Sequence, residues 1–359
     1  MRGGIHTAKA IYKYMIPHSR PTLDQSDFDG VLKVIKSGHL VQGEQTAGFE
    51  KGLSSLIGVK GGVAVSSGTA ALHLSLISLG VGKGDEVILP GFVCTAPLNA
   101  IHYVGASPVI AEIDRRTFNI DVNDLKRRIT KKTKAIIAPH MFGLPADLED
   151  IASLGIPVIE DCAHSLGSRY GDHYTGGIGA LSIFSFYATK VIATGEGGMV
   201  LSNNDGLIEG IKDLRDYDNR ESYAVRYNYK MTDIQAALGI AQLKKLSPFI
   251  KKRKEIADKY GRIFHDLSIP VPFVPKDREH IYYRYVVLLR DAELFMDAMM
   301  KKGVVCARPI FKPLHRYLGL SGYATTDLVW EKAVSIPIYP SLTDHEVGVI
   351  ANAVRSALT

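Results

Sequence analysis

From Gly68 to Asp161, short apolar runs alternate with amphipathic stretches, an order that few folds can accommodate. Because parallel strands are joined by helical crossovers, this order is typical of a mostly parallel sheet with helices on both faces. We expect strands at residues 86–90, 108–113, 134–139 and 157–160. We expect helices at residues 69–79, 122–129 and 148–154, with Asp121 and Asp147 as N-caps of the last two.

The second half of the sequence has a different character. A β-rich stretch covers residues 181–202, and helical patterns follow at residues 207–215 and 232–246. A long basic helix predicted at residues 247–267 leads to a proline cluster. Beyond it we expect strands at residues 282–289 and 304–307, and helices at residues 292–301 and from Asp344 onward. The chain therefore divides into a predicted large α/β domain, residues 1–246, and a smaller α+β domain, residues 247–359.

Composition and charge are those of a soluble globular protein. Of 359 residues, 46% are hydrophobic and 22% charged, which excludes a disordered chain. The net charge of +6 is spread over the whole length, so no nucleic-acid partner is predicted, whereas small anionic substrates fit. With neither a secretory signal pattern nor a run of about 18 apolar residues, we expect a cytoplasmic protein without a membrane partner.

The three cysteines, Cys94, Cys162 and Cys306, lie far apart in the sequence. They form neither the close pairs of a metal site nor a disulfide pattern. We therefore expect no metal ion, and a reducing compartment.

Two short segments could bind a phosphorylated ligand that also carries a positive charge. Ser66-Ser67-Gly68-Thr69 opens a predicted helix, whose N-terminal amides attract phosphate, although such residues are more often plain helix caps. Asp161 ends a predicted strand, where open α/β sheets present ligand-binding groups, and its carboxylate would attract a cation. A helix cap or a loop hydrogen bond is the structural alternative for Asp161.

Lys190 is the most unusual residue of the chain. An apolar and aromatic run, residues 181–188, precedes it, and Val191-Ile192 follows it. A partly desolvated lysine becomes a nucleophile that can form a Schiff base with a carbonyl group. The structural alternative is a lysine at a strand end whose charged tip reaches the solvent.

Together, a phosphate site, an acidic strand end and an apolar lysine form the set that pyridoxal 5'-phosphate (PLP) requires. The phosphate needs N–H donors, the ring nitrogen needs a carboxylate, and the aldehyde needs the lysine. A nicotinamide cofactor is disfavoured, since no G-x-G-x-x-G motif follows a predicted strand.

The residues resemble the DegT/DnrJ/StrS family of nucleotide-sugar aminotransferases, which have the PLP-dependent transferase fold of type I. The resemblance covers nearly the whole chain in family order. Its main motifs are Ser67-Gly68-Thr69-Ala70-Ala71-Leu72, Gly84-Asp85-Glu86-Val87, Glu160-Asp161-Cys162-Ala163-His164, Phe184-Ser185-Phe186, Lys190, Thr194-Gly195-Glu196-Gly197-Gly198, Tyr227-Asn228-Tyr229 and Pro313-Leu314-His315.

The resemblance implies a role for each matched residue. Lys190 would be the Schiff-base lysine and would move the proton between the substrate carbon and the cofactor. Asp161 would pair with the pyridinium nitrogen, and His164 would lie beside the ring and its 3'-oxygen. The implied reaction transfers an amino group from L-glutamate to a nucleotide-linked 3-keto or 4-keto sugar.

The resemblance also implies how the phosphate is held and how subunits combine. Gly68, Thr69 and Ser185 match positions that hold the cofactor phosphate. Asn228 matches a residue that reaches the phosphate of the neighbouring subunit's cofactor. A homodimer with two shared active sites is therefore expected.

Two positions depart from the family pattern. The segment Pro90-Gly91-Phe92-Val93-Cys94-Thr95 presents Cys94 where many members stack an aromatic residue on the pyridine ring, which leaves Phe92 or a thiol contact as the alternatives for the stacking partner. Lys230 replaces a common arginine, which removes bidentate phosphate recognition and leaves a candidate substrate-binding cation. Arg308 and His315 could also line the acceptor site, although a surface arginine and a packed histidine are the simpler interpretations.

Three other functions use the same scaffold. They are a sugar dehydratase, a cyclitol aminotransferase and a catalytically silent regulatory member of the family. Lys190 disfavours the dehydratase, whose relatives replace this lysine by histidine. It also weighs against a silent member, which has no need of it.

Overall fold

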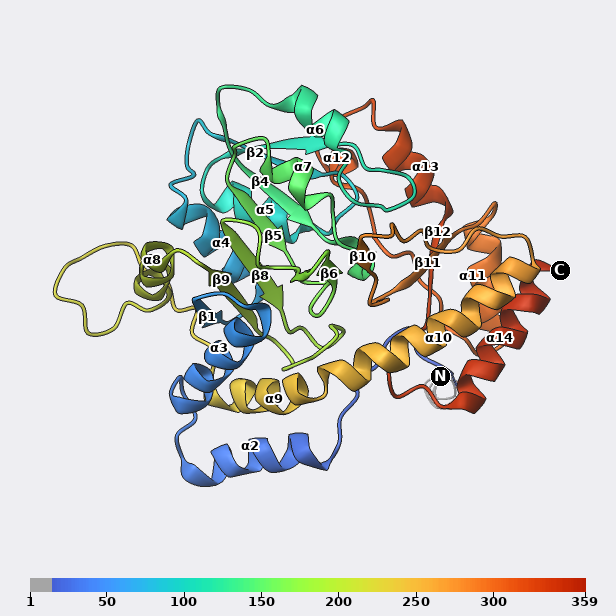
Figure 1. Cartoon of the computed structure of the whole chain (residues 1–359), viewed down its shortest axis with the longest axis horizontal. Coiled ribbons are helices and arrows are strands. Elements are labelled where there is room, and N and C mark those ends of the chain that lie inside the picture. The colour runs from blue at the N-terminus through green and yellow to red at the C-terminus, as the bar shows by residue number, and fades with distance from the viewer. Residues whose placement is uncertain (1–14) are drawn as a thin grey trace, which may run out of the picture.

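The computed structural model, which describes residues 15–359, is built on a seven-stranded sheet (Figure 1). The strand order is β1-β9-β8-β5-β4-β2-β3, in which β9 is antiparallel to β1 and β8, and all other pairings are parallel. The strands are β1 (Gly61–Val65), β2 (Glu86–Pro90), β3 (Ser107–Ala111), β4 (Thr133–Pro139), β5 (Val158–Asp161), β8 (Leu181–Ser185) and β9 (Gly198–Ser202). The predicted mostly parallel α/β sheet is confirmed.

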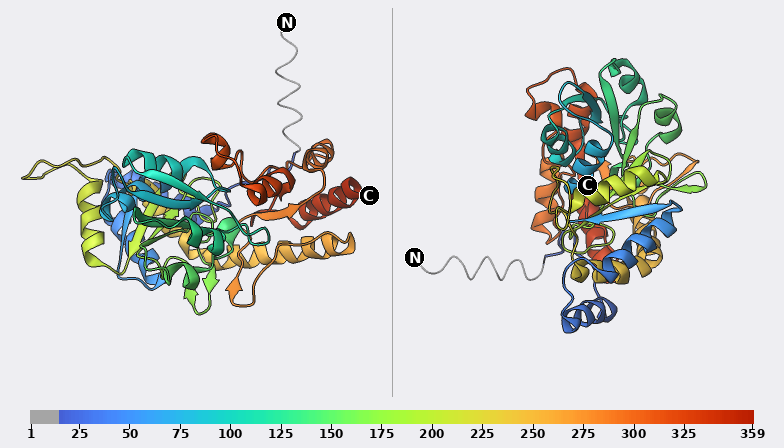
Figure 2. Two further views of the ribbon diagram at one scale, coloured as in Figure 1. Left: turned by 90° about the horizontal axis from the view of Figure 1, so that it is seen from above. Right: turned by 90° about the vertical axis from the view of Figure 1, so that its left-hand side faces the viewer.

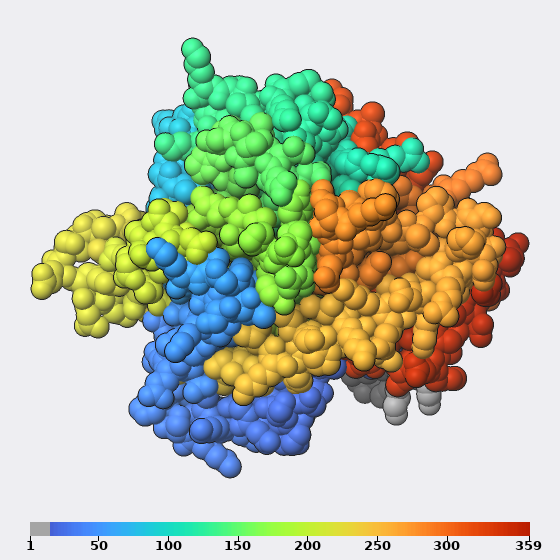
Figure 3. Space-filling model, in the orientation of Figure 1, coloured from blue at the N-terminus to red at the C-terminus, as the bar shows by residue number. Residues whose placement is uncertain are grey.

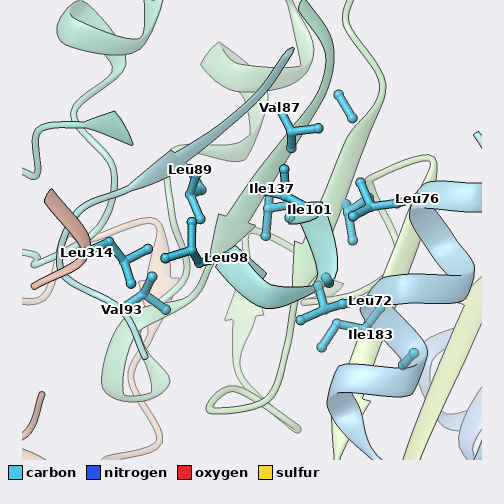
Figure 4. Close-up of a cluster of buried hydrophobic side chains, with 14 of the residues drawn as sticks. Leu72, Leu76, Val87, Leu89, Val93, Leu98, Ile101, Ile137, Ile183 and Leu314 are labelled. Carbon is cyan, nitrogen blue, oxygen red and sulfur yellow. The ribbon is translucent and has the colours of Figure 1, made fainter. Parts of the chain in front are cut away.

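Helices cover both faces of this sheet, because alternate side chains of each strand enter opposite cores. In β2, Val87 and Leu89 join the core under α4 and α5, whereas Ile88 joins the core under α6 and α7. Figure 4 shows the first of these cores, where Leu89 approaches Leu98. These helices are α2 (Gln25–Ser37), α3 (Glu44–Ile57), α4 (Gly68–Ser78), α5 (Thr95–Tyr103), α6 (Val122–Arg128), the 3-10 turn η1 (Met141–Gly143), α7 (Leu148–Ala152), α8 (Asp205–Arg215) and α9 (Asp233–Lys244).

The C-terminal part begins with the long helix α10 (Leu246–Asp266), which crosses the front of the molecule in Figure 3. A two-stranded antiparallel sheet, a separate core and four helices follow it. These elements are β11 (Tyr285–Leu288), α11 (Ala292–Lys301), α12 (Leu314–Tyr317), α13 (Ala324–Lys332), β12 (Ala333–Ile336) and α14 (Asp344–Leu358). A small three-stranded sheet joins the two parts, from β6 (Arg169–Tyr170), β7 (His173–Tyr174) and β10 (Arg278–Glu279).

Packing crosses the predicted domain boundary at residue 246 in both directions. Ile16, near the start of the described chain, packs in the C-terminal core, and Leu314 and Val329 pack in the core of the large sheet. The division into residues 1–246 and 247–359 therefore stays a prediction, and residues 1–14 of it lie outside the described part.

Several sequence-based expectations were wrong in detail. Residues 304–307 form no strand, because Val304 and Ala307 make only single bridges, to Ile16 and Ser335. Asp147 does occupy the N-cap position of α7, but its side chain makes no capping hydrogen bond and pairs instead with Arg278. Among residues 15–359, no helix has the length and hydrophobicity that crossing a membrane requires.

Candidate active site

A cavity of about 260 Å³ opens at the carboxyl ends of β5 and β8. Such strand ends are where open α/β sheets bind ligands. The cavity brings together residues from four separate segments that the sequence had singled out. They are Gly68, Thr69, Cys94, Asp161, His164, Ser185 and Lys190.

The start of α4 forms one wall of the cavity. Ser67 is the N-cap, and its side chain accepts a hydrogen bond from the Ala70 amide at 3.1 Å. Gly68 lies so close to Ser185 that a Cβ on Gly68 would be 2.9 Å from the Cβ of Ser185. The free amides of the helix start and the Ser185 hydroxyl therefore converge on one place, where an anion would be stabilised.

Asp161 closes β5 and is buried at the cavity floor. Its Oδ1 accepts a hydrogen bond from the Ala163 amide at 3.0 Å, and no donor among residues 15–359 reaches its Oδ2. Burial raises the pKa of the carboxyl group, although the Ala163 amide and the charge of Lys190 favour ionisation. A cationic N–H group in the cavity would supply the missing donor.

The side chain of Glu160, the residue before Asp161, points into the protein instead. It accepts hydrogen bonds from His140 Nε2 at 3.1 Å and from the amides of Gly176, Ile178 and Gly179 at 2.6–2.8 Å. These donors outweigh burial and lower the pKa of Glu160. Glu160 therefore fixes the end of β5 that carries Asp161.

Lys190 lies in the loop between β8 and β9. These two strands cover only the two ends of the β-rich stretch expected at residues 181–202. The Lys190 amide donates a hydrogen bond to the Tyr187 carbonyl at 2.8 Å, and the Thr194 amide donates one to the Phe186 carbonyl at 2.8 Å. The loop is therefore tightly folded. The ammonium pairs with no carboxylate among the described residues. It lies 5.3 Å from the ring centroid of Tyr283.

His164 stacks on Tyr283, with ring centroids 4.5 Å apart and planes inclined by 26°. Burial, followed by the charges of Lys190 and Arg284, lowers the pKa of His164 well below its ordinary value. The imidazole is therefore neutral and can offer one hydrogen-bond donor or acceptor beside the cavity.

Cys94 stands at the N-cap position of α5 and lines the cavity where an aromatic residue is common in the family. The residue is accessible to solvent, yet the protein atoms around its thiol desolvate the sulfur and raise its pKa. Cys94 therefore presents a neutral thiol to the cavity.

The other four predicted residues lie outside this cavity. Asn228 is exposed on the segment between α8 and α9, which projects from the body (Figures 1 and 2). Lys230 follows in the same segment and is bound by its own chain, with Nζ 2.6 Å from Asp216 and 3.2 Å from Asp218. Both carboxylates raise the pKa of Lys230, so its charge is already engaged.

Arg308 and His315 belong to the C-terminal part. Arg308 pairs with Glu293 at 2.6 Å, and its guanidinium lies over the Trp330 ring. His315 is buried, 3.0 Å from Asp327, and does not line the cavity. Their contacts are those of a structural arginine and a packed histidine.

Sequence reasoning missed three residues at this site. Tyr187 and Glu196 line the cavity on either side of Lys190, and Glu196 lies within a motif already noted. Tyr283 contacts Lys190 and His164 from outside the cavity. No local signal marks Tyr283, because it lies far along the chain from both partners.

Comparison with known proteins gives consistent results. GDP-perosamine synthase of Escherichia coli O157:H7 is 35% identical, with 95% of this chain and 98% of the relative covered. A UDP-N-acetyl-3-dehydro-alpha-D-glucosamine 3-aminotransferase of Acidithiobacillus ferrooxidans is 30% identical over 95% and 96% of the two chains.

Solved structures agree in fold. A putative sugar aminotransferase of Streptococcus pneumoniae, in its PMP form, superposes with a TM-score of 0.90 at 28% identity, over 96% of this chain and 98% of that one. The expected PLP-dependent transferase fold of type I is thereby confirmed. The sequence profile of the DegT/DnrJ/EryC1/StrS aminotransferase family matches residues 21–355, and the chain belongs to this family.

Proposed function

We propose that this enzyme moves an amino group from L-glutamate to a nucleotide-linked keto sugar, at a 3-keto or 4-keto carbon. The observation that carries the proposal is the convergence of Lys190, Asp161 and the start of α4 on one cavity. The relatives named above support a nucleotide sugar as acceptor, since their names specify GDP-linked and UDP-linked sugars.

The cofactor is PLP, and the residues of the cavity fit it. The amides of Gly68 and Thr69 and the hydroxyl of Ser185 would hold the phosphate. The carboxylate of Asp161 would accept from the ring N–H, and His164 would flank the ring. The bound cofactor supplies an electron sink for the substrate carbon.

The chain's own residues then handle protons and orientation. Lys190 carries the only ammonium among the described residues that line the cavity, so its Nζ takes and returns the substrate proton. Asp161, held by Ala163, stays positioned to accept from a cation. Phe142 stacks near His164 and, with Tyr283, limits water behind the imidazole.

An absorption experiment tests the proposed reaction. The PLP-loaded protein should lose its visible band when L-glutamate is added and regain it with a nucleotide keto sugar. A Lys190→Ala variant should bind PLP without turning over. A protein that holds PLP through Lys190 yet ignores glutamate would have another donor or reaction, and one that never binds PLP would refute the proposal.

We also propose a cytoplasmic homodimer with shared active sites. Asn228 is exposed and does not line its own cavity, and it lies on a projecting segment where Tyr223 is 96% exposed and Val225 64% exposed. The helix α2 adds an apolar stripe of Phe28, Leu32 and Ile35, each about half exposed. Such surfaces support an interface between copies.

The free thiols among the described residues support a reducing compartment.

Mixing two inactive variants tests the shared sites. Lys190→Ala and Asn228→Asp should each have little activity alone, the second because its charge repels phosphate. If each site combines both subunits, a mixed dimer has one intact site, and activity should return after the two proteins exchange subunits. No recovery in mixtures that sedimentation identifies as mixed dimers would refute shared sites.

A further inference from the structure

Tyr283 contacts the two residues that would handle the cofactor, although it does not line the cavity itself. Its ring centroid is 5.3 Å from Lys190 Nζ and 4.5 Å from the ring centroid of His164. The side chain is buried, with 4% of its surface exposed. A cation within about 6 Å of a ring is attracted to it, and tilted stacking is a favoured aromatic geometry.

The ring of Tyr283 is itself held from several directions. Its hydroxyl lies 3.3 Å from the hydroxyl of Thr189, the neighbour of Lys190 in sequence. The backbone carbonyl of Tyr283 accepts a hydrogen bond from the Arg253 guanidinium of α10 at 3.2 Å. The Arg284 guanidinium lies 5.1 Å from the ring centroid. A buried ring with this many contacts presents a fixed surface to Lys190.

Arg284 extends this set of contacts to distant parts of the chain. Its Nη1 lies 2.8 Å from His18 Nδ1, and His18 Nε2 lies 2.8 Å from the Ser335 hydroxyl in β12. The placement of Tyr283 therefore depends on the N-terminal segment and on the C-terminal sheet, both remote from the cavity floor.

We propose that Tyr283 is a positioning residue, whose ring holds the Lys190 ammonium and the His164 imidazole in one fixed arrangement. The lysine needs such a support, because it has four rotatable bonds and no carboxylate partner among the described residues. The proposal rests on the proposed function, since it assigns Tyr283 to the same reaction. The ring, more than the hydroxyl, carries the effect.

The charges around Tyr283 agree with this placement. Lys190, Arg284 and Arg253 face it from three different segments, while His164 beside it is neutral. Burial alone would raise the pKa of Tyr283, but Lys190, Arg284 and the Thr189 hydrogen bond together lower it to about 8. The side chain thus lies among positive charges that favour its ionised form.

Substitutions that separate ring from hydroxyl test the proposal. Tyr283→Phe keeps the ring, whereas Tyr283→Met fills similar space without one. Tyr282→Phe, one residue away and stacked on His280, is the matched control. Each PLP-loaded protein is measured by visible circular dichroism, by the single-turnover rate with L-glutamate, and by the unfolding temperature without cofactor.

We expect Tyr283→Phe and Tyr282→Phe to keep the dichroism and to react within about threefold of wild type. Tyr283→Met should lose at least half of the dichroism and react about tenfold more slowly, with PLP still bound, because it removes the aromatic face beside the Lys190 ammonium. If Tyr283→Met does not fold, Tyr283→Leu takes its place under the same criteria.

A folded, PLP-bound Tyr283→Met protein with wild-type dichroism and rate would overturn the proposal. Equal losses in Tyr283→Phe would also overturn it, because they would assign the effect to the hydroxyl. Failure of the proposed function is distinct, since then the wild-type protein itself would not bind PLP or would not react with glutamate. If the wild-type protein binds PLP but does not react with glutamate, the dichroism comparison still decides the role of Tyr283.

Discussion

Gly198 of β9 lies directly against the carbonyl of Ser67, the N-cap of α4. A Cβ on Gly198 would be 2.4 Å from the Ser67 oxygen and 2.8 Å from the Gly68 nitrogen. Both atoms belong to the backbone and cannot move aside as a side chain would. The absence of a side chain at position 198 therefore lets the sheet approach the helix start that would hold the cofactor phosphate.

The substitution Gly198→Ala should displace the start of α4. We expect PLP binding to weaken at least about tenfold and the unfolding free energy to fall by about 1–3 kcal/mol, the usual effect of overpacking. Equilibrium dialysis and urea unfolding would measure the two effects. The control is Gly210→Ala in α8, where a Cβ meets nothing within 4 Å. That change should leave PLP binding intact and stabilise the protein by up to about 1 kcal/mol.

Glu160→Gln should destabilise the protein without removing any group from the cavity. The new amide cannot accept the four hydrogen bonds that Glu160 accepts from His140 and three backbone amides. We expect a loss of about 2–5 kcal/mol, measured by urea unfolding. Glu209→Gln, which breaks an exposed pair with Lys212, should change stability by less than about 1 kcal/mol. Similar losses in both variants would contradict the buried role of Glu160.

The fold was predictable where local patterns and tertiary structure agree. The strand at residues 86–90 and the helix at residues 292–301 have the predicted bounds, because each is a short apolar or amphipathic run between turn residues. The helices α2 and α3 were missed. In α2 the apolar residues Phe28, Leu32 and Ile35 form a stripe that is about half exposed in place of lying in the core.

The site was predictable to the extent that each residue lies in a distinctive local motif. Lys190, Asp161 and the Ser67-Gly68-Thr69 turn are of this kind, and the fold brings them together. Tyr283 belongs to no such motif, since its role depends on contacts across the fold. Arg308 and His315 show how proximity to a motif can mislead. Both were candidate substrate-binding residues, but Arg308 pairs with Glu293 and His315 with Asp327, so their polar groups are engaged within the chain.

Buried histidines should make the protein sensitive to mild acid. Burial, with Arg284 adding to it at His18, lowers the pKa of His18 and of His280 to about 3. The unfolded chain takes up these protons from about pH 6.5 downward, and the folded chain does not. The unfolding free energy should therefore fall by about 1.4 kcal/mol per pH unit for each histidine between pH 6.5 and about 3.

Unfolding by urea at a series of pH values checks this slope. His18→Gln should remove one histidine's share of the slope, and the double variant His18→Gln with His280→Gln should remove two. An unchanged slope in the double variant would show that other groups govern the acid sensitivity.

Tyr283 should titrate near neutral pH, which distinguishes it from ordinary tyrosines. Because Lys190, Arg284 and Thr189 outweigh burial, its pKa is about 8 in place of 10. Above pH 8 the folded chain releases this proton while the unfolded chain keeps it. The unfolding free energy should therefore rise by up to about 3 kcal/mol between pH 8 and pH 10, and this gain should vanish as the pH falls through 8.

Ultraviolet difference absorbance of the cofactor-free protein can follow the tyrosinate directly. One tyrosine should ionise near pH 8 in the wild type and in Tyr282→Phe, since burial raises the pKa of Tyr282. The same step should be absent from Tyr283→Phe. A Lys190→Ala variant should move the step to higher pH, because the charge that does most to lower the pKa of Tyr283 is then gone. A step that persists in Tyr283→Phe would assign the low pKa to another residue and remove the electrostatic link between Tyr283 and Lys190.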